Sequence, residues 1–277
     1  MSIPCRAIRT LTLAVSLLAP ALVQADTLLE FLVKEGASAP AKVQTVAIKD
    51  GRMMAKGAGG DRTIDLLFTQ AEQGVEVIDH GQRTVMRVDE GEVARLNQQA
   101  RGVQPLLQGL GQQIAKLSPE ERRQWQELVG GGISLERIAK AQGPLEPTRL
   151  VSTGGQRTVA GVRCQSMRVI QGDTAMAELC LAGPKTLKLP APDYATVRGL
   201  LTLYERLAAQ GEGLARQLGL ALPVFTIAQE LGLPVALKDL SRAGHGTVTL
   251  RRIQTSPLSP DQLRVPSGYR AKPLTLW

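Results

Sequence analysis

Two cysteines, Cys164 and Cys180, lie on either side of a short turn and predict a disulfide-closed β-hairpin. They belong to two strand-like runs, 162–170 and 174–181, and the three residues between these runs are centred on Gly172. A short loop that contains glycine is typical of a hairpin. Each cysteine is eight positions from Gly172, so folding there places the two opposite each other, at the short Cβ separation that a disulfide needs. Closing such a loop contributes roughly 3 kcal/mol on the loop-entropy account.

Redox chemistry and metal binding are the alternative roles for this cysteine pair. Redox pairs usually sit about two residues apart, and two thiolates without nearby histidines make a poor zinc site. We therefore predict a structural disulfide between Cys164 and Cys180, and such a bond forms and persists in an oxidising compartment.

The first 25 residues have the features of a secretory signal peptide. Arg6 and Arg9 precede an apolar run, 11–23, and the run leads into a small-x-small site that closes at Ala25. This order of charge, apolar run and small residues is typical of a cleaved signal. A transmembrane anchor is the alternative, but the run is shorter than the roughly 20 residues that a spanning helix needs, and a proline interrupts it. We expect cleavage after Ala25 and a periplasmic protein.

The mature chain, residues 26–277, is long enough for one substantial domain or two small ones, and we expect a single domain. The signal holds two of the 33 basic residues and none of the 25 acidic ones, which leaves the mature chain with a net charge of +6. These charges are scattered rather than clustered, and aromatic residues are sparse, which argues against nucleic-acid binding. No second apolar stretch is long enough to span a membrane, so we expect no transmembrane span after cleavage.

Strand-like runs dominate both ends of the mature chain. In its first third, the predicted strands are 28–34, 43–49, 63–69, 75–79 and 84–88, separated by turn residues. Strands return in 148–181, and the runs 235–240 and 247–255 predict a closing hairpin before a polar tail. Runs of strands alternating with helical segments predict an α+β fold, in which an antiparallel sheet has its helices grouped on one face.

A helical insert, about 90–142, interrupts these strands. Capping-box patterns begin at Asp89 and at Ser118, and Gly102 and Pro105 are expected to break or kink the first helix into two. Apolar residues recur at the helical spacing of three and four: Val93, Leu96, Ala100, Val103, Leu107, Leu110, Ile114 and Leu117. We expect this stripe to pack on the protein's own sheet; docking on a partner helix is the alternative.

A further helix is predicted after Asp193. Its apolar side chains share one face, and we treat that face as the candidate ligand-binding surface. The face consists of Val197, Leu200, Leu201, Tyr204 and Leu207.

Catalytic and metal-binding motifs are missing from the sequence. Its two histidines, His80 and His245, sit beside glycines in predicted turns, where histidine is usually exposed to solvent and inert. There is no nucleophile elbow, zinc-binding helix motif, phosphate loop or dinucleotide fingerprint. We expect no catalytic residue, no cofactor and no metal.

Several turn and hairpin segments resemble those of a known family. The segments are Ile48 to Met53, Val77 to His80 with Arg83 and Thr84, Val159 to Cys164, Glu178 to Ala182, and Val265 to Tyr269. They resemble a family of exported bacterial proteins of unknown function related to the LolA/LolB lipoprotein-carrier superfamily. The resemblance implies a curved antiparallel sheet, an open half-barrel, with helices across its concave side. In the carriers that concavity accepts the acyl chains of a lipoprotein, whereas this chain adds the helical insert and the cystine.

These observations leave three functional hypotheses. The first is a non-catalytic periplasmic protein that shelters a lipid or acyl group in a half-barrel, with the 197–207 helix face as its lid. The second is an envelope protein–protein interaction module whose helices fill the concavity. The third, a hydrolase, finds the least support because no catalytic motif is present.

Overall fold

The computed structural model describes residues 26–36, 38–58, 63–129, 147–217, 226–240 and 246–275. The predicted signal peptide, residues 1–25, lies outside these ranges, as do His245 and the last part of the helical insert, 130–142. None of the described helices is both long enough and apolar enough to cross a membrane.

One open sheet organises the described part of the chain. Its strands are β1 (Thr27–Lys34), β2 (Lys42–Lys49), β3 (Arg52–Lys56), β4 (Ile64–Thr69), β5 (Gly74–Asp79), β6 (Thr84–Val88), β7 (Thr148–Val159), β8 (Val162–Gln171), β9 (Thr174–Ala182), β10 (Leu233–Asp239), β11 (Thr247–Thr255) and β12 (Arg270–Ala271). Their order across the sheet is β12-β6-β5-β4-β3-β2-β1-β11-β10-β9-β8-β7. All neighbouring strands are antiparallel except β12, which pairs with β6 in parallel. The predicted α+β class and mostly antiparallel sheet are confirmed.

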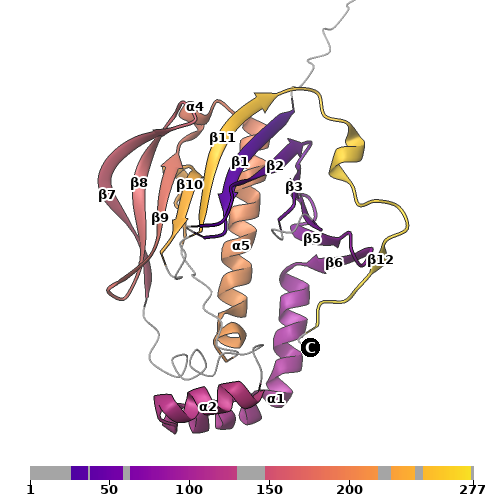
Figure 1. The fold of residues 1–277 in the computed structure, drawn as a ribbon. Helices are drawn as coiled ribbons and strands as arrows, with labels where there is room; N and C mark the ends of the chain where they lie inside the picture. Colours follow the sequence, from indigo (N-terminus) through magenta and orange to yellow (C-terminus); the bar gives the residue numbers. More distant parts are fainter. Residues whose placement is uncertain are drawn as a thin grey trace, which may run out of the picture.

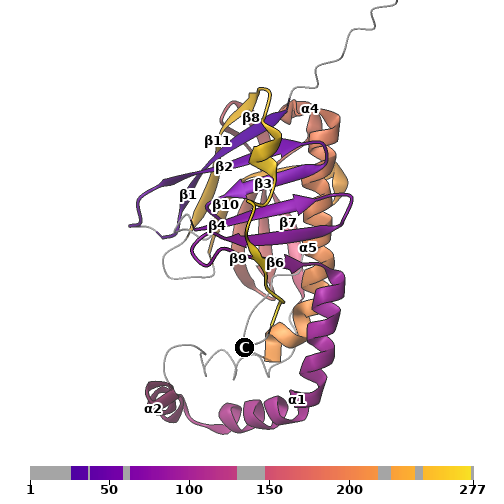
Figure 2. The same cartoon turned by 90° about the vertical axis from the view of Figure 1, so that its right-hand side faces the viewer.

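The helices lie mainly on one side of this sheet. They are α1 (Glu90–Lys116), α2 (Pro119–Val129), α4 (Pro184–Leu187) and α5 (Ala191–Gln217), with short 3-10 turns η1 (Gln229–Leu231) and η2 (Pro260–Leu263). The sheet bends around α5, which runs along its inner side (Figures 1 and 2). The first part of α1 packs beside α5, where the Asn97 side chain donates to the Gln210 carbonyl oxygen at 2.8 Å. The second helix of the insert, α2, lies away from the sheet (Figure 2).

We predicted that Gly102 and Pro105 divide this region into two helices. The prediction is wrong, because one unbroken helix runs from Glu90 to Lys116. Figure 2 shows instead that α1 bends along its length. Proline lacks an N–H and crowds the preceding turn, which accounts for a bend without a break. Both predicted caps are present: Asp89 accepts from the Glu92 N–H at 2.9 Å, and Ser118 from the Glu121 N–H at 3.2 Å.

Apolar side chains from both faces of the sheet are buried in β2, β3 and β4. Ile48, Met53 and Phe68 face the inner core beside α5. Their sequence neighbours Ala47, Met54 and Leu67 belong to a second core on the outer face. The sequence pattern does not predict strand β3, because a strand buried on both faces shows no alternation of polar and apolar residues.

The C-terminal segment, 256–272, covers part of the outer face. Leu258 and Leu263 are buried in the outer core, and Tyr269 packs against it. Figure 1 shows this segment running from β11 along the side of the molecule to β12. The interpretation of this region as a polar tail is therefore wrong: its few apolar residues are spaced to meet the outer face.

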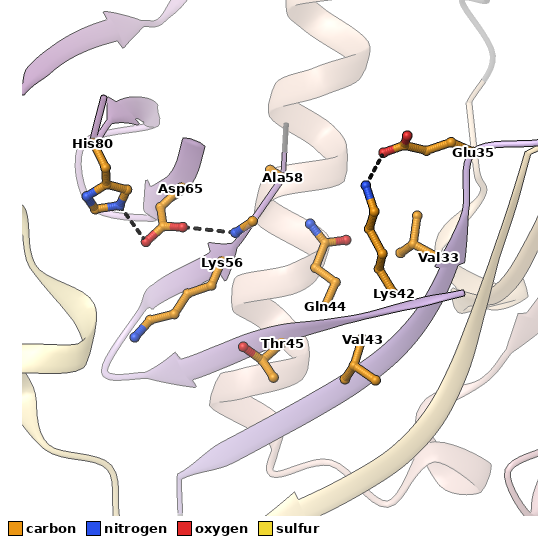
Figure 3. Close-up of a pocket in the computed structure, with 11 residues that line it drawn as sticks. Val33, Glu35, Lys42, Val43, Gln44, Thr45, Lys56, Ala58, Asp65 and His80 are labelled. Carbon is orange, nitrogen blue, oxygen red and sulfur yellow. Dashed lines mark hydrogen bonds and ion pairs between the residues drawn. The ribbon is translucent and has the colours of Figure 1, made fainter. Parts of the chain in front are cut away.

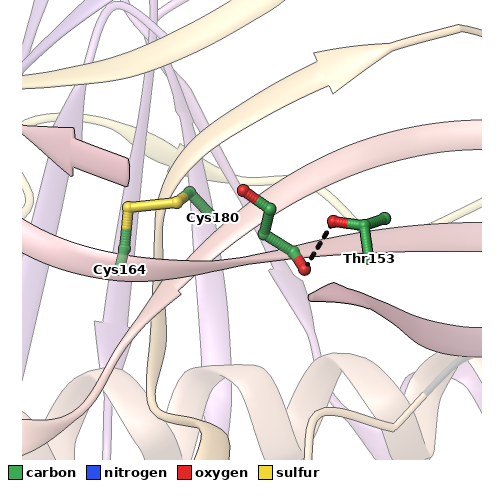
Figure 4. The surroundings of a disulfide bond; sticks show 4 residues. Thr153, Cys164 and Cys180 are labelled. Carbon is green, nitrogen blue, oxygen red and sulfur yellow. Dashed lines mark hydrogen bonds between the residues drawn. A yellow bond between two sulfur atoms is a disulfide. The ribbon is translucent and has the colours of Figure 1, made fainter. Parts of the chain in front are cut away.

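The predicted disulfide is present but its strand register differs from the prediction. Cys164 and Cys180 are bonded, with a Cα–Cα distance of 5.4 Å (Figure 4). In the ladder, however, Cys180 lies opposite Ser166 rather than Cys164. The turn contains two residues instead of three, since Gln171 pairs with Thr174, and an irregularity at 169/170 shifts the register again. The bond therefore links diagonal rather than directly opposed positions.

Candidate functional site

An apolar cavity of about 270 Å³ lies between the inner face of the sheet and α5. Among the described residues that line it, Gln44 is the only one with a polar side chain. The lining residues are Leu29, Phe31, Gln44, Val46, Met53, Leu187, Leu189, Val197, Leu201, Leu233, Pro234, Val235, Ala236, Leu237, Val248, Leu250 and Ile253. Water forms few hydrogen bonds with such walls, so an apolar ligand would be favoured over water in this cavity.

Six segments build the wall of the apolar cavity. Strands β1, β2, β3, β10 and β11 supply its sheet side, and α5 with the residues just before it supplies the opposite side. Phe31, Val46 and Ile253 are only partly buried, so the cavity is not sealed from solvent. Entry of a ligand therefore does not require the buried core to open.

The predicted ligand-binding face of α5 divides into three groups. Val197 and Leu201 line the cavity. Leu200 and Leu207 pack against the inner core without lining the cavity. Tyr204 is 42% exposed. Two of the five candidates thus contribute to the cavity wall.

Sequence reasoning does not identify most of the other wall residues. Leu187 and Leu189 precede α5, and the stretch from Leu233 to Leu237 belongs to β10. Leu203, which is fully buried, is also absent from the predicted face although it lies in the middle of α5. Because α5 is buried on more than one side, a single apolar stripe could not identify all of its buried residues, and Leu203 was missed.

Gly232 fixes the entry of the chain into β10. Its φ angle is +93°, and a Cβ atom at this position would lie 2.0 Å from the Ala182 carbonyl oxygen. No residue with a side chain fits so close to the backbone. This glycine therefore allows β10 to lie against β9 and to line the cavity.

A second, polar cavity of about 640 Å³ lies at the ends of β1 to β5. Gln44 lines both cavities. Figure 3 shows Lys42 and Gln44 of β2 on one side of the polar cavity and Asp65 with His80 on the other. Lys42 and Glu35 form a loose ion pair at 3.6 Å.

His80 is held by two partners and is not a free turn residue. Its Nε2 atom lies 3.0 Å from the Asp65 carboxylate, and its Nδ1 atom 2.8 Å from the Tyr269 hydroxyl. Asp65 also accepts from the Gly57 N–H at 2.9 Å. This chain of hydrogen bonds ties the C-terminal segment to β4 and β5. The expectation that His80 is simply exposed is wrong, because both ring nitrogens have partners. These partners come from distant parts of the chain and could not be predicted from the sequence of the turn.

A buried carboxyl group anchors the start of α5. The Thr27 hydroxyl donates a hydrogen bond to Asp193, and both residues are buried. Burial raises the pKa of Asp193 above its ordinary value, and the carboxylates of Asp26 and Asp50 raise it further, while the Thr27 hydrogen bond opposes the shift. The site thus penalises the charged form of Asp193 more than water does.

The fold and its cavities define the class: an α+β protein whose single open, mostly antiparallel sheet bends around a helix and leaves an apolar cavity beside it. No family model matches the chain, and no curated protein matches it. Its similarities are to solved structures at very low sequence identity.

Three such structures cover about nine tenths of this chain. An uncharacterised conserved protein from Thermus thermophilus has a TM-score of 0.39 at 8% identity and is covered over 91% of its length. PNGF-II has a TM-score of 0.40 at 6% identity, and this chain spans 31% of it. A LolA superfamily protein from Nitrosomonas europaea has a TM-score of 0.27 at 7% identity and is covered over 92%. Likenesses this remote identify no function.

Proposed function

We propose that this protein is a non-catalytic periplasmic protein that binds one apolar chain, such as a lipid acyl chain, in the cavity between its sheet and α5. The observation that carries the proposal is the composition of the wall: of the lining residues that the structure describes, Gln44 alone has a polar side chain. The volume of about 270 Å³ is just below the roughly 300–1,000 Å³ of typical small-molecule sites, which fits a slender ligand.

The proposal includes a LolA-like half-barrel fold and an exported location. The Cys164–Cys180 disulfide supports an oxidising compartment, because such bonds are rare in the cytosol. The N-terminal charge, apolar run and small-residue site support export to such a compartment. The bending of the sheet around α5 supports the half-barrel (Figure 2).

Binding energy would come from methylene burial. Each buried methylene contributes about 0.8 kcal/mol, while association itself costs at least about 4 kcal/mol. Short apolar molecules should therefore bind poorly, and a chain must bury more than about five methylenes before a net gain appears.

The test is to block the cavity with one side chain. Ala236 lines the cavity, so Ala236→Phe should fill part of it. Ala209, an exposed residue of α5, provides the matched control Ala209→Phe. The mature protein is purified gently from its native envelope, examined by native mass spectrometry for bound lipid, and titrated with a fluorescent fatty acid.

We expect co-purifying lipid and a fluorescence gain for the unmodified protein and for Ala209→Phe, with both clearly reduced in Ala236→Phe. Absence of bound lipid together with no fluorescence gain in the unmodified protein would overturn the proposal. Equal binding by Ala236→Phe and Ala209→Phe would place the ligand elsewhere and overturn it as well.

A further inference from the structure

The polar cavity adjoins the apolar cavity along one face of strands β1 and β2. Three directly opposed residue pairs follow one another along these strands: Leu29 with Val46, Phe31 with Gln44, and Val33 with Lys42. Each pair is two positions from the next, so all three pairs lie on the same face of the sheet. The first two pairs line the apolar cavity, and the third pair lines the polar cavity.

Gln44 lies where the two linings meet. It is a wall residue of both cavities, and Figure 3 shows its side chain on the same side of β2 as that of Lys42. Lys42 is two residues from Gln44 along β2, a distance of about 7 Å in an extended strand. A molecule whose apolar end lies beside Phe31 therefore reaches Lys42 by extending one residue pair along this face.

The charged groups at this end of β2 are open to a ligand. The side chains of Lys42 and Glu35 line the polar cavity and are 40% and 55% exposed. Among the described residues, the pairing of β2 with β3 ends at Thr45 and Lys56, so the edge of β2 beyond this pair borders the cavity. A ligand contacts Lys42 without uncovering any buried group.

The acidic groups of the polar cavity are more firmly held than its lysines. The Asp65 carboxylate lies 3.0 Å from His80 Nε2 and accepts from the Gly57 N–H at 2.9 Å. Glu35 and Lys42 are paired only at 3.6 Å, and Lys56 has no ion pair with a described residue. An added anion can therefore bind at Lys42, and lysine is a common ligand of phosphate groups.

The two volumes favour a ligand with one slender chain and a larger head group. The apolar cavity measures about 270 Å³ and the polar cavity about 640 Å³. A carboxylate or a hydroxyl would occupy little of the polar cavity, whereas a glycerol phosphate would occupy more of it.

We infer that the ligand is a single-chain glycerophospholipid, whose acyl chain lies in the apolar cavity and whose phosphate accepts hydrogen bonds from Lys42 in the polar cavity. The glycerol passes Gln44, which lines both spaces. This inference rests on the proposed function and names its ligand class. The chain supplies most of the affinity through methylene burial, and the phosphate supplies selectivity among lipids with the same chain.

The test compares lysophosphatidic acid with the monoacylglycerol that carries the same acyl chain. The two lipids differ only in the phosphate, and each displaces a neutral fluorescent apolar probe from the mature protein below its critical micelle concentration. We expect the phosphate to tighten binding about three- to tenfold at low ionic strength. The ratio should fall as salt is added, because a partly exposed charge pair is screened.

Three variants locate this preference. Lys42→Met keeps the apolar stem and removes the charge, so it should bring the ratio of the two affinities close to one and leave monoacylglycerol binding unchanged. Glu35→Gln should raise the ratio, because Glu35 competes for Lys42 and repels a phosphate. Lys34→Met is the matched control, since Lys34 ends β1 on the opposite face and lines neither cavity; it should keep the full ratio.

The outcomes separate the inference from the proposed function. Equal binding of the two lipids to the unmodified protein would overturn the inference while chain binding stands. A ratio that survives in Lys42→Met, or that falls equally in Lys34→Met, would overturn it too, because the phosphate would then not bind at Lys42. If the probe itself does not bind and neither lipid binds, both the inference and the proposed function fail.

Discussion

At the residue scale, the inner core depends on a few side chains with no exposed surface. Leu203 is 0% exposed and lies in the cluster that joins α5 to β2, β3 and β4. Leu203→Ala should lower the free energy of unfolding by about 2–5 kcal/mol, because it removes buried methylenes and leaves a cavity. Chemical denaturation measures the loss.

The neighbouring Tyr204 supplies the comparison for Leu203. It is 42% exposed, so Tyr204→Ala should cost clearly less than Leu203→Ala in the same measurement. An equal or larger loss for Tyr204→Ala would contradict the placement of Leu203, rather than Tyr204, at the centre of the α5 packing face.

Asp193 gives the fold a pH dependence of a defined sign. Burial, followed by the charges of Asp26 and Asp50, raises the pKa of this carboxyl in the folded protein. The folded state then binds the proton more tightly than the unfolded chain does. Its contribution to stability is full below the unfolded pKa of about 3.9 and is lost as the pH rises through the higher folded pKa.

Asp193→Asn should therefore be at least as stable as the unmodified protein at pH 7 and should lose that advantage in acid. Asparagine cannot ionise, and its carbonyl oxygen can still accept the Thr27 hydroxyl hydrogen bond that Asp193 receives. Denaturant midpoints across pH 3 to 8 measure the effect, with Asp173→Asn in the exposed hairpin turn as control. A variant that is much less stable at pH 7 would show that the charged form is the one the fold needs.

At the element scale, most strands could be predicted because their turns are marked by glycine and polar residues. Predicted and observed bounds of β1, β2, β4, β5, β6, β10 and β11 differ by two residues or fewer. Strand β3 could not be predicted because Met53 and Met54 are buried on opposite faces. Met54 is buried on the outer face by residues some 200 positions later in the chain. No local sequence pattern reveals that contact.

The candidate site could be predicted less completely than the fold. The helical period of α5 identifies Val197 and Leu201, but Leu187 and Leu189 come from the segment just before α5, and the rest of the cavity wall comes from strands distant in sequence.

The C-terminal segment is fastened to the sheet by the hydrogen bond between the Tyr269 hydroxyl and His80. Tyr269→Phe should reduce the free energy of unfolding by about 1 kcal/mol. The loss should be local, so amide hydrogen exchange should accelerate in 256–272 and leave β1 and β11 unchanged.

Tyr194→Phe is the matched control for Tyr269→Phe, because its hydroxyl has no partner among the described residues. We expect its stability to equal or slightly exceed that of the unmodified protein. If both variants lose the same stability, the Tyr269–His80 bond does not hold the segment, and the outer core of Leu258 and Leu263 together with the pairing of β12 and β6 does so.

At the scale of the whole molecule, the two faces of one strongly bent sheet are covered by different parts of the chain. Its outer face is closed by the C-terminal segment over part of its area, and its inner face by α5. A single helix does not fill the space inside a bent sheet evenly, since the sheet curves around it (Figure 2). The apolar cavity beside Val197 and Leu201 is the part that α5 leaves unfilled.

Because the cavity has a limited size, we expect the gain in affinity to stop at a certain length of the ligand's acyl chain. Each added methylene should tighten binding about fourfold, the equivalent of about 0.8 kcal/mol, until the space of about 270 Å³ is full. Longer chains should then gain nothing or bind less tightly. Because a ligand that binds only the folded state raises its stability, the thermal unfolding midpoint at fixed ligand concentration should rise with chain length and then level off.

The measurement uses a series of saturated fatty acids from six to eighteen carbons, with Ala236→Phe as the cavity-filled control. In that variant the plateau should move to shorter chains, since less of the cavity remains. A midpoint that rises steadily with chain length in both proteins would indicate detergent-like binding to the surface rather than a bounded interior. A plateau at the same length in both would place the ligand outside the cavity that α5 and the sheet enclose.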